Sequence, residues 1–336
     1  MLQIFREIGQ GLLSLLLKVG KGGSIAKRIE VELSLSPAIR ASFEKRSAEL
    51  PPFEDVNTAI RVLKDLDNLI PNAKSTVVVL DELEVLTDDD RRDLAFFIKQ
   101  VGDQDFRLRF VLVGIAENVH ELIGVHQSIA RYIKEVSLQP LYPQDLMDIV
   151  STAAEAVGVE VPREYLLRVA IIGNGFPHFA HLMGKSMLIE VVVADAVLVT
   201  PVTYKLGVER AVKGSIQELK IAYETAVQRG SDYYKHLIWA LANSDIVDVR
   251  NDEWLQMYHE LEHRLGWKSV DESKLKNAIG NFKNDAYGKI IMSTPARYGS
   301  AEIRYRYKRF SNMLMRGHVR LQAEQDGVTL GRQPGM

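Results

Sequence analysis

The sequence predicts an α/β protein that is mostly α overall. Two short apolar runs, residues 75–80 and 107–113, flank a helical pattern over residues 89–101, which is the strand–helix–strand order of a parallel sheet. After Pro140 the apolar residues follow helical spacing until two short strand patterns near the end. We therefore expect a small α/β part, an all-helical middle, and a last part of three helices and a hairpin.

Composition limits the classes of protein that remain. The 336 residues allow two or three domains, and 46% hydrophobic residues are enough for a sizeable core. A net charge of −2 argues against a chain that is basic throughout, and the lack of cysteine excludes disulfides, cysteine-ligated metals and a cysteine nucleophile. The apolar run of residues 12–17 is too short for a membrane span and lacks the features of an export signal. We expect a cytoplasmic protein that does not enter the membrane.

The first part, residues 1–140, contains the predicted parallel sheet. The β-branched run Ser75-Thr-Val-Val-Val-Leu80 is typical of a strand buried on both faces. Apolar residues at helical spacing predict a helix over residues 54–70, which Pro71 ends. The expected elements are helices 2–19, 54–70 and 89–101, strands 75–80 and 107–113, and a very short third strand 135–138.

After Pro140 we expect a helical segment over residues 141–230, then a domain over residues 231–322 and a disordered tail over residues 323–336. Three helices followed by a hairpin is the order of a winged helix-turn-helix. The expected helices are 143–157, 163–172, 177–193, 202–228, 232–243, 252–265 and 271–283, and the expected strands are 289–293 and 302–307.

The strongest chemical signal is the acid pair Asp81 and Glu82 directly after the first strand. Ligands of α/β proteins bind at the carboxyl edge of the sheet, where this pair is expected. Two adjacent carboxylates there suit ATP chemistry, because one can hold Mg²⁺ through water and the other can orient the attacking water. The alternative is an acidic surface loop, since more acidic residues follow nearby.

The order apolar-Asp-Glu, helix, then Phe106-Arg-Leu-Arg-Phe-Val-Leu-Val-Gly-Ile-Ala-Glu-Asn118 resembles the second half of an AAA+ ATPase core of the P-loop NTPase class. The resemblance implies bound ATP and Mg²⁺, with Asp81 positioning the metal ion and Glu82 polarising water. It implies that Asn118 senses the γ-phosphate. Arg131, four residues before Glu135, matches the arginine finger of the initiator-like members, which acts across a subunit interface and so implies a homo-oligomer. The alternatives are a helix cap for Asn118 and a surface side chain for Arg131.

Gly173-Asn-Gly-Phe-Pro-His178 resembles the Gly-x-Pro element of the helical AAA+ lid, where the proline and the helix start pack near the nucleotide. Pro177 and His178 are therefore candidate nucleotide contacts. The sensor-2 arginine that many lids carry is absent, because His178 follows the proline. The structural alternative is that proline simply suits the first turn of a helix.

The largest departure from the family is that no Gly-x-x-x-x-Gly-Lys-[Ser/Thr] precedes Asp81. Gly184-Lys-Ser186 has the right ending, but it lies within an expected helix and Phe179 stands at the first glycine position. A phosphate-binding loop supplies backbone N–H groups and a lysine, which acidic residues do not replace. We expect the chain to be amino-terminally incomplete relative to the family and to bind ATP poorly on its own.

Basic residues interleaved with tyrosines gather around the predicted hairpin. Such a wing could contact DNA phosphates, with the helix 271–283 near the major groove, although Asp271 and Glu272 at its start disfavour base contacts. The candidate nucleic-acid contacts are Lys289, Arg297, Arg304, Arg306 and Arg309. Winged helices also bind proteins, so a protein partner remains open.

A third pattern is His259-Glu-Leu-Glu-His263, which on a helix places two histidines on one face, as in zinc hydrolases. Ser269 stands where the extended motif expects a third histidine. Three hypotheses follow: an AAA+ protein that couples nucleotide state to DNA or a protein partner, a non-enzymatic winged-helix binding module, and a zinc hydrolase.

Overall fold

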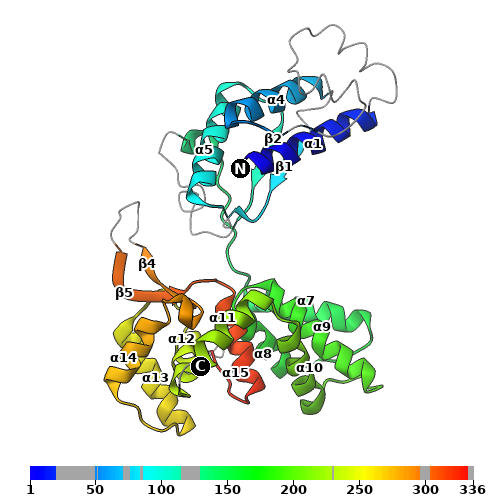
Figure 1. Ribbon diagram of the computed structural model, residues 1–336. Helices are drawn as coiled ribbons and strands as arrows, with labels where there is room; N and C mark the ends of the chain where they lie inside the picture. The colour runs from blue at the N-terminus through cyan, green and yellow to red at the C-terminus, as the bar shows by residue number, and fades with distance from the viewer. Residues whose placement is uncertain are drawn as a thin grey trace. The chain divides into compact units, whose positions relative to one another are not determined.

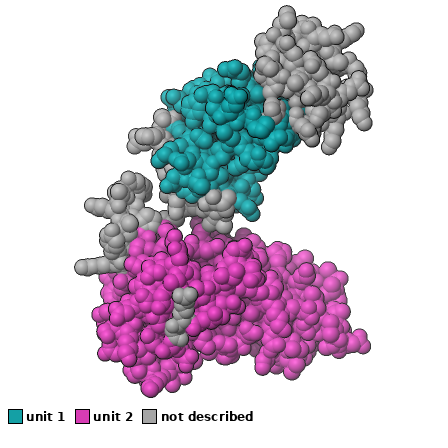
Figure 2. Space-filling model, viewed as in Figure 1, with its two compact units in different colours: residues 1–138 teal, residues 139–336 magenta. Residues whose placement is uncertain are grey.

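A computed structural model describes residues 1–19, 50, 52–70, 76–83, 86–114, 129–228, 231–295 and 303–331, without the side chains of residues 14–19, 130, 295 and 303–306. The chain divides into two compact units, Met1–Leu138 and Gln139–Met336, which are coloured separately in Figure 2. Each unit has its own hydrophobic core. The two are therefore described one at a time.

Unit 1 contains a two-stranded parallel sheet and helices packed on it (Figure 1). Its elements are α1 (Leu2–Val19), α4 (Val56–Leu69), β1 (Val77–Leu80), α5 (Asp88–Asp103), β2 (Arg109–Leu112) and the 3₁₀ turn η4 (Ala130–Tyr132). The pairing Val77↔Arg109 to Leu80↔Leu112 confirms that the first two predicted strands are parallel. Asp55 caps α4 by accepting from the Thr58 N–H, and Thr87 caps α5 in the same way from Asp90.

The sheet differs from the prediction in two respects. Alternate residues of each strand face the core of unit 1, whereas Val77 and Val79 are 50% and 59% exposed. The prediction of strands buried on both faces is wrong for the described residues, because helices cover only one face there. The predicted third strand is also absent: residues 135–138 have no strand conformation, and Leu138 is 88% exposed.

Asp67 fixes α4 to the start of β2. Its buried carboxylate accepts the backbone N–H groups of Arg107 and Leu108, with N···O distances of 2.9 and 2.7 Å. Lys64 lies 3.3 Å from the same carboxylate. Asp67 is buried in the middle of an apolar helix face, and its carboxylate accepts two backbone N–H groups before β2. Without it these N–H groups would lack an acceptor.

Unit 2 is mainly helical and ends with a three-stranded antiparallel sheet of order β3-β5-β4. Its helices are α7 (Pro143–Ala156), α8 (Arg163–Gly173), α9 (Pro177–Val193), α10 (Pro201–Gly214), α11 (Gln217–Gln228), α12 (Tyr233–Asn243), α13 (Asn251–Leu265), α14 (Glu272–Asn281), the 3₁₀ turn η5 (Asp285–Tyr287) and α15 (Met315–Gln325), and its strands are β3 (Val249–Arg250), β4 (Ile291–Pro295) and β5 (Ile303–Phe310). The hairpin and most of the predicted helices are confirmed.

The helical segment and the carboxyl-terminal part share one hydrophobic core rather than two. Helix α15 joins them: Gly317 packs so closely on α9 that a Cβ there would lie 2.4 Å from the Phe179 ring. Arg168 of α8 and Tyr204 of α10 both bond to Glu324 of α15. The predicted boundary near residue 230 therefore falls inside one compact unit.

Two further predictions in unit 2 need correction. The expected helix 202–228 is broken at Ser215, whose extended backbone separates α10 from α11 and whose hydroxyl lies 2.8 Å from the buried His318 Nδ1. The expected disordered tail begins inside α15, and Leu330 is fully buried. Asn243 accepts the Gly331 N–H at 3.0 Å, which ties residues up to 331 to α12.

Candidate functional site

The acid pair lies at the carboxyl end of β1, as predicted. The ladder continues past the strands, because the Val113 N–H donates to Leu80 at 2.8 Å and the Leu83 N–H donates to Val113 at 3.2 Å. Asp81 and Glu82 are the two exposed residues in the turn between these bonds. The edge of the parallel pair thus presents two carboxylates to solvent.

The turn itself has an unusual backbone. Glu82 has φ +59°, a left-handed conformation that is uncommon outside glycine and asparagine. The Asp81 carboxylate stabilises it by accepting the Glu82 N–H at 2.8 Å. One Asp81 oxygen is therefore engaged by the main chain, while the Glu82 carboxylate makes no hydrogen bond or ion pair within the described residues.

These residues fit only part of an ATP–Mg²⁺ site. Mg²⁺ in such sites is held by one or two carboxylates together with substrate phosphates and water, which Asp81 and Glu82 could supply in part. The described residues contain no group of three or more His, Cys, Asp or Glu that could hold a metal ion. A phosphate would additionally need N–H groups and a lysine, and the sequence has no Gly-x-x-x-x-Gly-Lys-[Ser/Thr] pattern, which usually provides them.

Two other residues of unit 1, Asn118 and Arg131, were predicted to contact the nucleotide, and the structure describes only the second. Asn118 lies outside the described residues. Arg131 is exposed in η4, and its guanidinium lies 4.8 Å from the centre of the Tyr132 ring. That ring packs flat on the α5 backbone at Gly102, where a Cβ would lie 2.2 Å from it. No ion pair joins Arg131 to the acid pair in the described part of unit 1, and its contact there is with the Tyr132 ring.

Pro177 and His178 belong to unit 2 and begin α9. Gly175, with φ +84°, precedes them in a turn that accepts the Leu141 N–H at 2.9 Å. Pro177 is exposed at the first helical position. His178 is half-buried, its Nε2 has no hydrogen-bond partner among the described residues, and burial, with a smaller effect of His181, lowers the pKa of its ring. A neutral imidazole here is a poor substitute for a sensor arginine.

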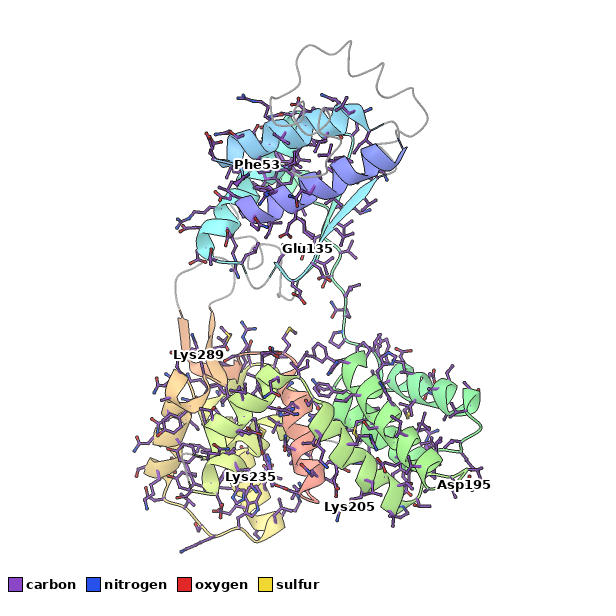
Figure 3. The ribbon with its side chains drawn as sticks, turned by 45° about the vertical axis from the view of Figure 1, so that its right-hand side comes forward. Phe53, Glu135, Asp195, Lys205, Lys235 and Lys289 are labelled. Atoms are coloured by element: carbon purple, nitrogen blue, oxygen red, sulfur yellow. The ribbon has the colours of Figure 1, made fainter. Side chains whose placement is uncertain are left out.

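The predicted DNA-contacting residues divide into three groups. Lys289 is exposed in the turn before β4 and is labelled in Figure 3. Arg304 and Arg306 lie on β5 with side chains that are not described, and Arg297 lies outside the described residues. The prediction that Arg309 contacts DNA is wrong, because the residue is only 8% exposed and its Nε lies 3.9 Å from Asp248.

Other cations near the hairpin are also part of the interior. Lys308 is 3% exposed and donates to Ser293 at 3.1 Å. Arg316 donates to the carbonyl oxygens of Asp245 and Ile246, and burial lowers its pKa to about 10. Arg316 serves here as a donor to carbonyl groups in the loop that follows α12. The positive charge counted in the sequence is therefore larger than the charge on the surface.

Helix α14 supplies cations that the sequence analysis did not select. Lys274 and Lys276 are exposed, whereas Leu275, Ala278 and Ile279 between and after them are buried. Lys283, just past the helix, is also exposed. The alternation of lysines with buried apolar residues at helical spacing was the signal that could have identified this face.

The two histidines of the zinc pattern are both exposed on α13. His259 Nδ1 lies 3.0 Å from a Glu262 carboxylate oxygen, so it already has a partner on its own helix. The described residues supply no third ligand beside them. Within the described ranges, moreover, every helix is too short or too polar to cross a membrane.

No protein-family model matches the sequence, and neither does any curated protein. Among solved structures, similarity is found to Cdc6p from Pyrobaculum aerophilum, at 15% identity over 80% of this chain and 71% of that one, with a TM-score of 0.35. The ORC2 protein of Aeropyrum pernix, in ADPNP–ADP complexes, has 15% identity over the same shares and a TM-score of 0.40. The RuvB Holliday junction branch migration motor of Thermotoga maritima has 13% identity over 92% of this chain and 95% of that one, with a TM-score of 0.35. Similarity at this level leaves function to be argued from the residues themselves.

Proposed function

We propose that the carboxyl-terminal part of unit 2 is a winged helix that binds duplex DNA. The observation that carries this proposal is the order α12, β3, α13, α14, β4, β5 with an antiparallel sheet β3-β5-β4. In a winged helix with this order, α14 would be the second helix of the helix-turn-helix and the β4–β5 hairpin would be the wing. Helices in that position enter the major groove of DNA.

The charge on α14 supports the assignment. Lys274, Lys276 and Lys283 are exposed on or beside the helix, and Lys289 follows in the turn before β4. Glu272 at the helix start is paired with Lys276 at 2.6 Å. Long cationic side chains along one helix and the adjoining turn suit phosphate oxygens, which provide most of the affinity of non-specific DNA binding.

The test is fluorescence anisotropy with a labelled DNA duplex, measured over a series of salt concentrations. The double variant Lys283→Glu/Lys289→Glu should weaken binding and reduce the salt slope by about 0.9 for each phosphate that the protein no longer neutralises. The matched control Lys205→Glu/Lys213→Glu changes the net charge equally at exposed positions on α10. An equal decrease in affinity in the two variants would reject the segment from the end of α14 to the turn before β4 as the DNA-binding surface.

A second function is favoured by the acid pair at the end of β1. We propose that Asp81 and Glu82 are the acidic half of an AAA+ ATP–Mg²⁺ site, with Asn118 and Arg131 in the roles that the resemblance implies. Arg131 would then act on the site of a second copy, and nucleotide state would be coupled to DNA or a protein partner.

This second proposal makes a negative prediction for the chain as given. Without a phosphate-binding loop it should bind ATP weakly, and Glu82→Gln should leave any residual phosphate release unchanged. The measurement is ADP formation by the full chain with ATP and Mg²⁺. ATP turnover that disappears in Glu82→Gln would show that the chain completes the site in another way.

A further inference from the structure

A groove runs between α7 and α9 on the surface of unit 2. Its volume is about 410 Å³, and its walls are almost entirely aliphatic. The α7 wall includes Ile149, Ala153 and Val157, and the α9 wall includes Leu188, Val192 and Val193. Gly184 lets the two helices meet at the bottom, because a Cβ there would lie 3.0 Å from Val150. The groove is therefore part of the helix packing rather than a gap between loops.

The aliphatic surface extends beyond the groove. Val157, Val192 and Val193 are 55%, 60% and 72% exposed, which is unusual for valines that are close together. The Glu160 N–H donates to the Val197 carbonyl at 2.7 Å, so the turn after α7 is held beside the turn after α9. Val197, which is 71% exposed, lies in the same turn, two residues after Asp195, which is labelled in Figure 3.

The charge at the groove has one sign. His181 and Lys185 are the polar side chains that line it, and no carboxylate does. Both are exposed, and within the described residues Lys185 takes part in no hydrogen bond or ion pair. A ligand that fills the groove would therefore place an anionic group beside Lys185 and aliphatic groups along the rest.

We propose that this groove docks an amphipathic α-helix of a partner protein, with aliphatic side chains in the groove and a carboxylate at Lys185. A third helix packs naturally in the furrow between two others, and apolar anchors on successive turns are the usual contacts. The α9 wall from Ala180 to Val193 is about 20 Å long, which matches a helix of about 15 residues. A small apolar molecule could fill the groove but would leave Val197 uncovered.

The proposal is tested with the full chain and two labelled helical peptides of about 15 residues. Both carry leucines at i, i+4, i+7 and i+11. They differ only at the positions beside the leucines, where the acidic peptide has glutamate and the basic peptide has lysine. Fluorescence anisotropy should show saturable binding of the acidic peptide. Lys185→Glu should lower the affinity for the acidic peptide at least about 5-fold and raise the affinity for the basic one. The reason is that the side chain at position 185 would then repel glutamate and attract lysine. Val192→Asp should abolish binding, whereas Ile221→Asp, at an exposed position on α11, should not.

Several outcomes would overturn the proposal. Equal affinity of both peptides, no binding of either, or unchanged binding in Val192→Asp would each reject a helix in this groove. Displacement of an environment-sensitive dye by decanoate without peptide binding would assign the groove to small amphiphiles instead. A dimer of the unmodified chain that Val192→Asp dissociates would assign it to a second copy. Circular dichroism of each variant checks that an exposed substitution has left the fold intact.

Discussion

The side chain of Arg320, in the middle of α15, binds the ends of α8 and α12, and its removal should destabilise unit 2 strongly. Only 2% of the residue is exposed. Its guanidinium donates to the carbonyl oxygens of Ile171 at the end of α8, Ala242 in α12 and Ser244 just after α12, at 2.6, 2.8 and 3.2 Å. It also pairs with Asp245 at 2.7 Å. Arg320→Ala therefore leaves three carbonyl groups and one carboxylate without this donor.

The magnitude follows from those four partners. Each buried carbonyl without a donor costs about 1–3 kcal/mol, and the costs are not additive where water can enter the space. Asp245 is 55% exposed, so water can replace the guanidinium at that carboxylate and the cost arises mainly at the three carbonyl groups. For a unit of this size each kcal/mol lowers the melting temperature by about 2–4 °C. We expect Arg320→Ala to destabilise unit 2 by about 3–5 kcal/mol, or roughly 6–20 °C.

Urea denaturation followed by circular dichroism measures the change. Arg320→Lys should fall between the wild type and Arg320→Ala, because lysine keeps the charge but cannot donate in three directions at once. Arg250→Ala is the control, since its side chain is 45% exposed and its pairing with Asp252 should contribute less than about 1 kcal/mol. If Arg320→Ala costs no more than Arg250→Ala, the guanidinium does not hold the helix ends together.

Three further predictions concern buried contacts in both units. Burial lowers the pKa of His318 to about 4, so the unfolded chain, with an ordinary histidine pKa near 6.5, binds more protons below that pH and the free energy of unfolding should fall by about 2 kcal/mol between pH 6.5 and 4. His318→Gln should flatten this dependence in denaturation curves, and an unchanged slope would exclude His318 as its source. Gly207→Ala should cost about 1–3 kcal/mol in the same assay, because the added Cβ would lie 2.7 Å from the Met187 backbone; Gly280→Ala, with open space around it, should instead stabilise by about 0.5–1 kcal/mol. Asp67→Ala should cost unit 1 about 3 kcal/mol by leaving two buried backbone N–H groups unpaired, and a cost below about 1 kcal/mol would show that water replaces the carboxylate.

The sequence predicted local structure well where one residue pattern dominates. Helical spacing and proline positions located α4, α7, α8 and α9 to within a few residues. It missed the break at Ser215, where the hydroxyl contacts His318, about a hundred residues later. Strand β3 is two residues long and exists through its pairing with β5, so no local pattern could reveal it.

The candidate DNA surface shows the same division. The number of basic residues near β5 predicted a DNA contact there, but Arg309 is buried. Lys274 and Lys276 are exposed on α14. The acidic residues at the start of that helix had argued against base contacts from it. The sequence gives the number of charged residues but not which of their side chains are exposed to solvent. Burial of an arginine requires carbonyl or carboxylate partners, and these come from other helices.

The sequence by itself determined the order of most elements, the acid pair at the end of the first strand and the lack of a Gly-x-x-x-x-Gly-Lys-[Ser/Thr] pattern before it, because each depends on neighbouring residues alone. Only the tertiary structure decided that one face of the β1–β2 pair is exposed, that unit 2 has a single core, and that Arg316 and Arg320 serve its interior. The α7–α9 groove also belongs to this second group. Such features arise from packing between segments far apart in the chain, which periodicity along the sequence does not encode.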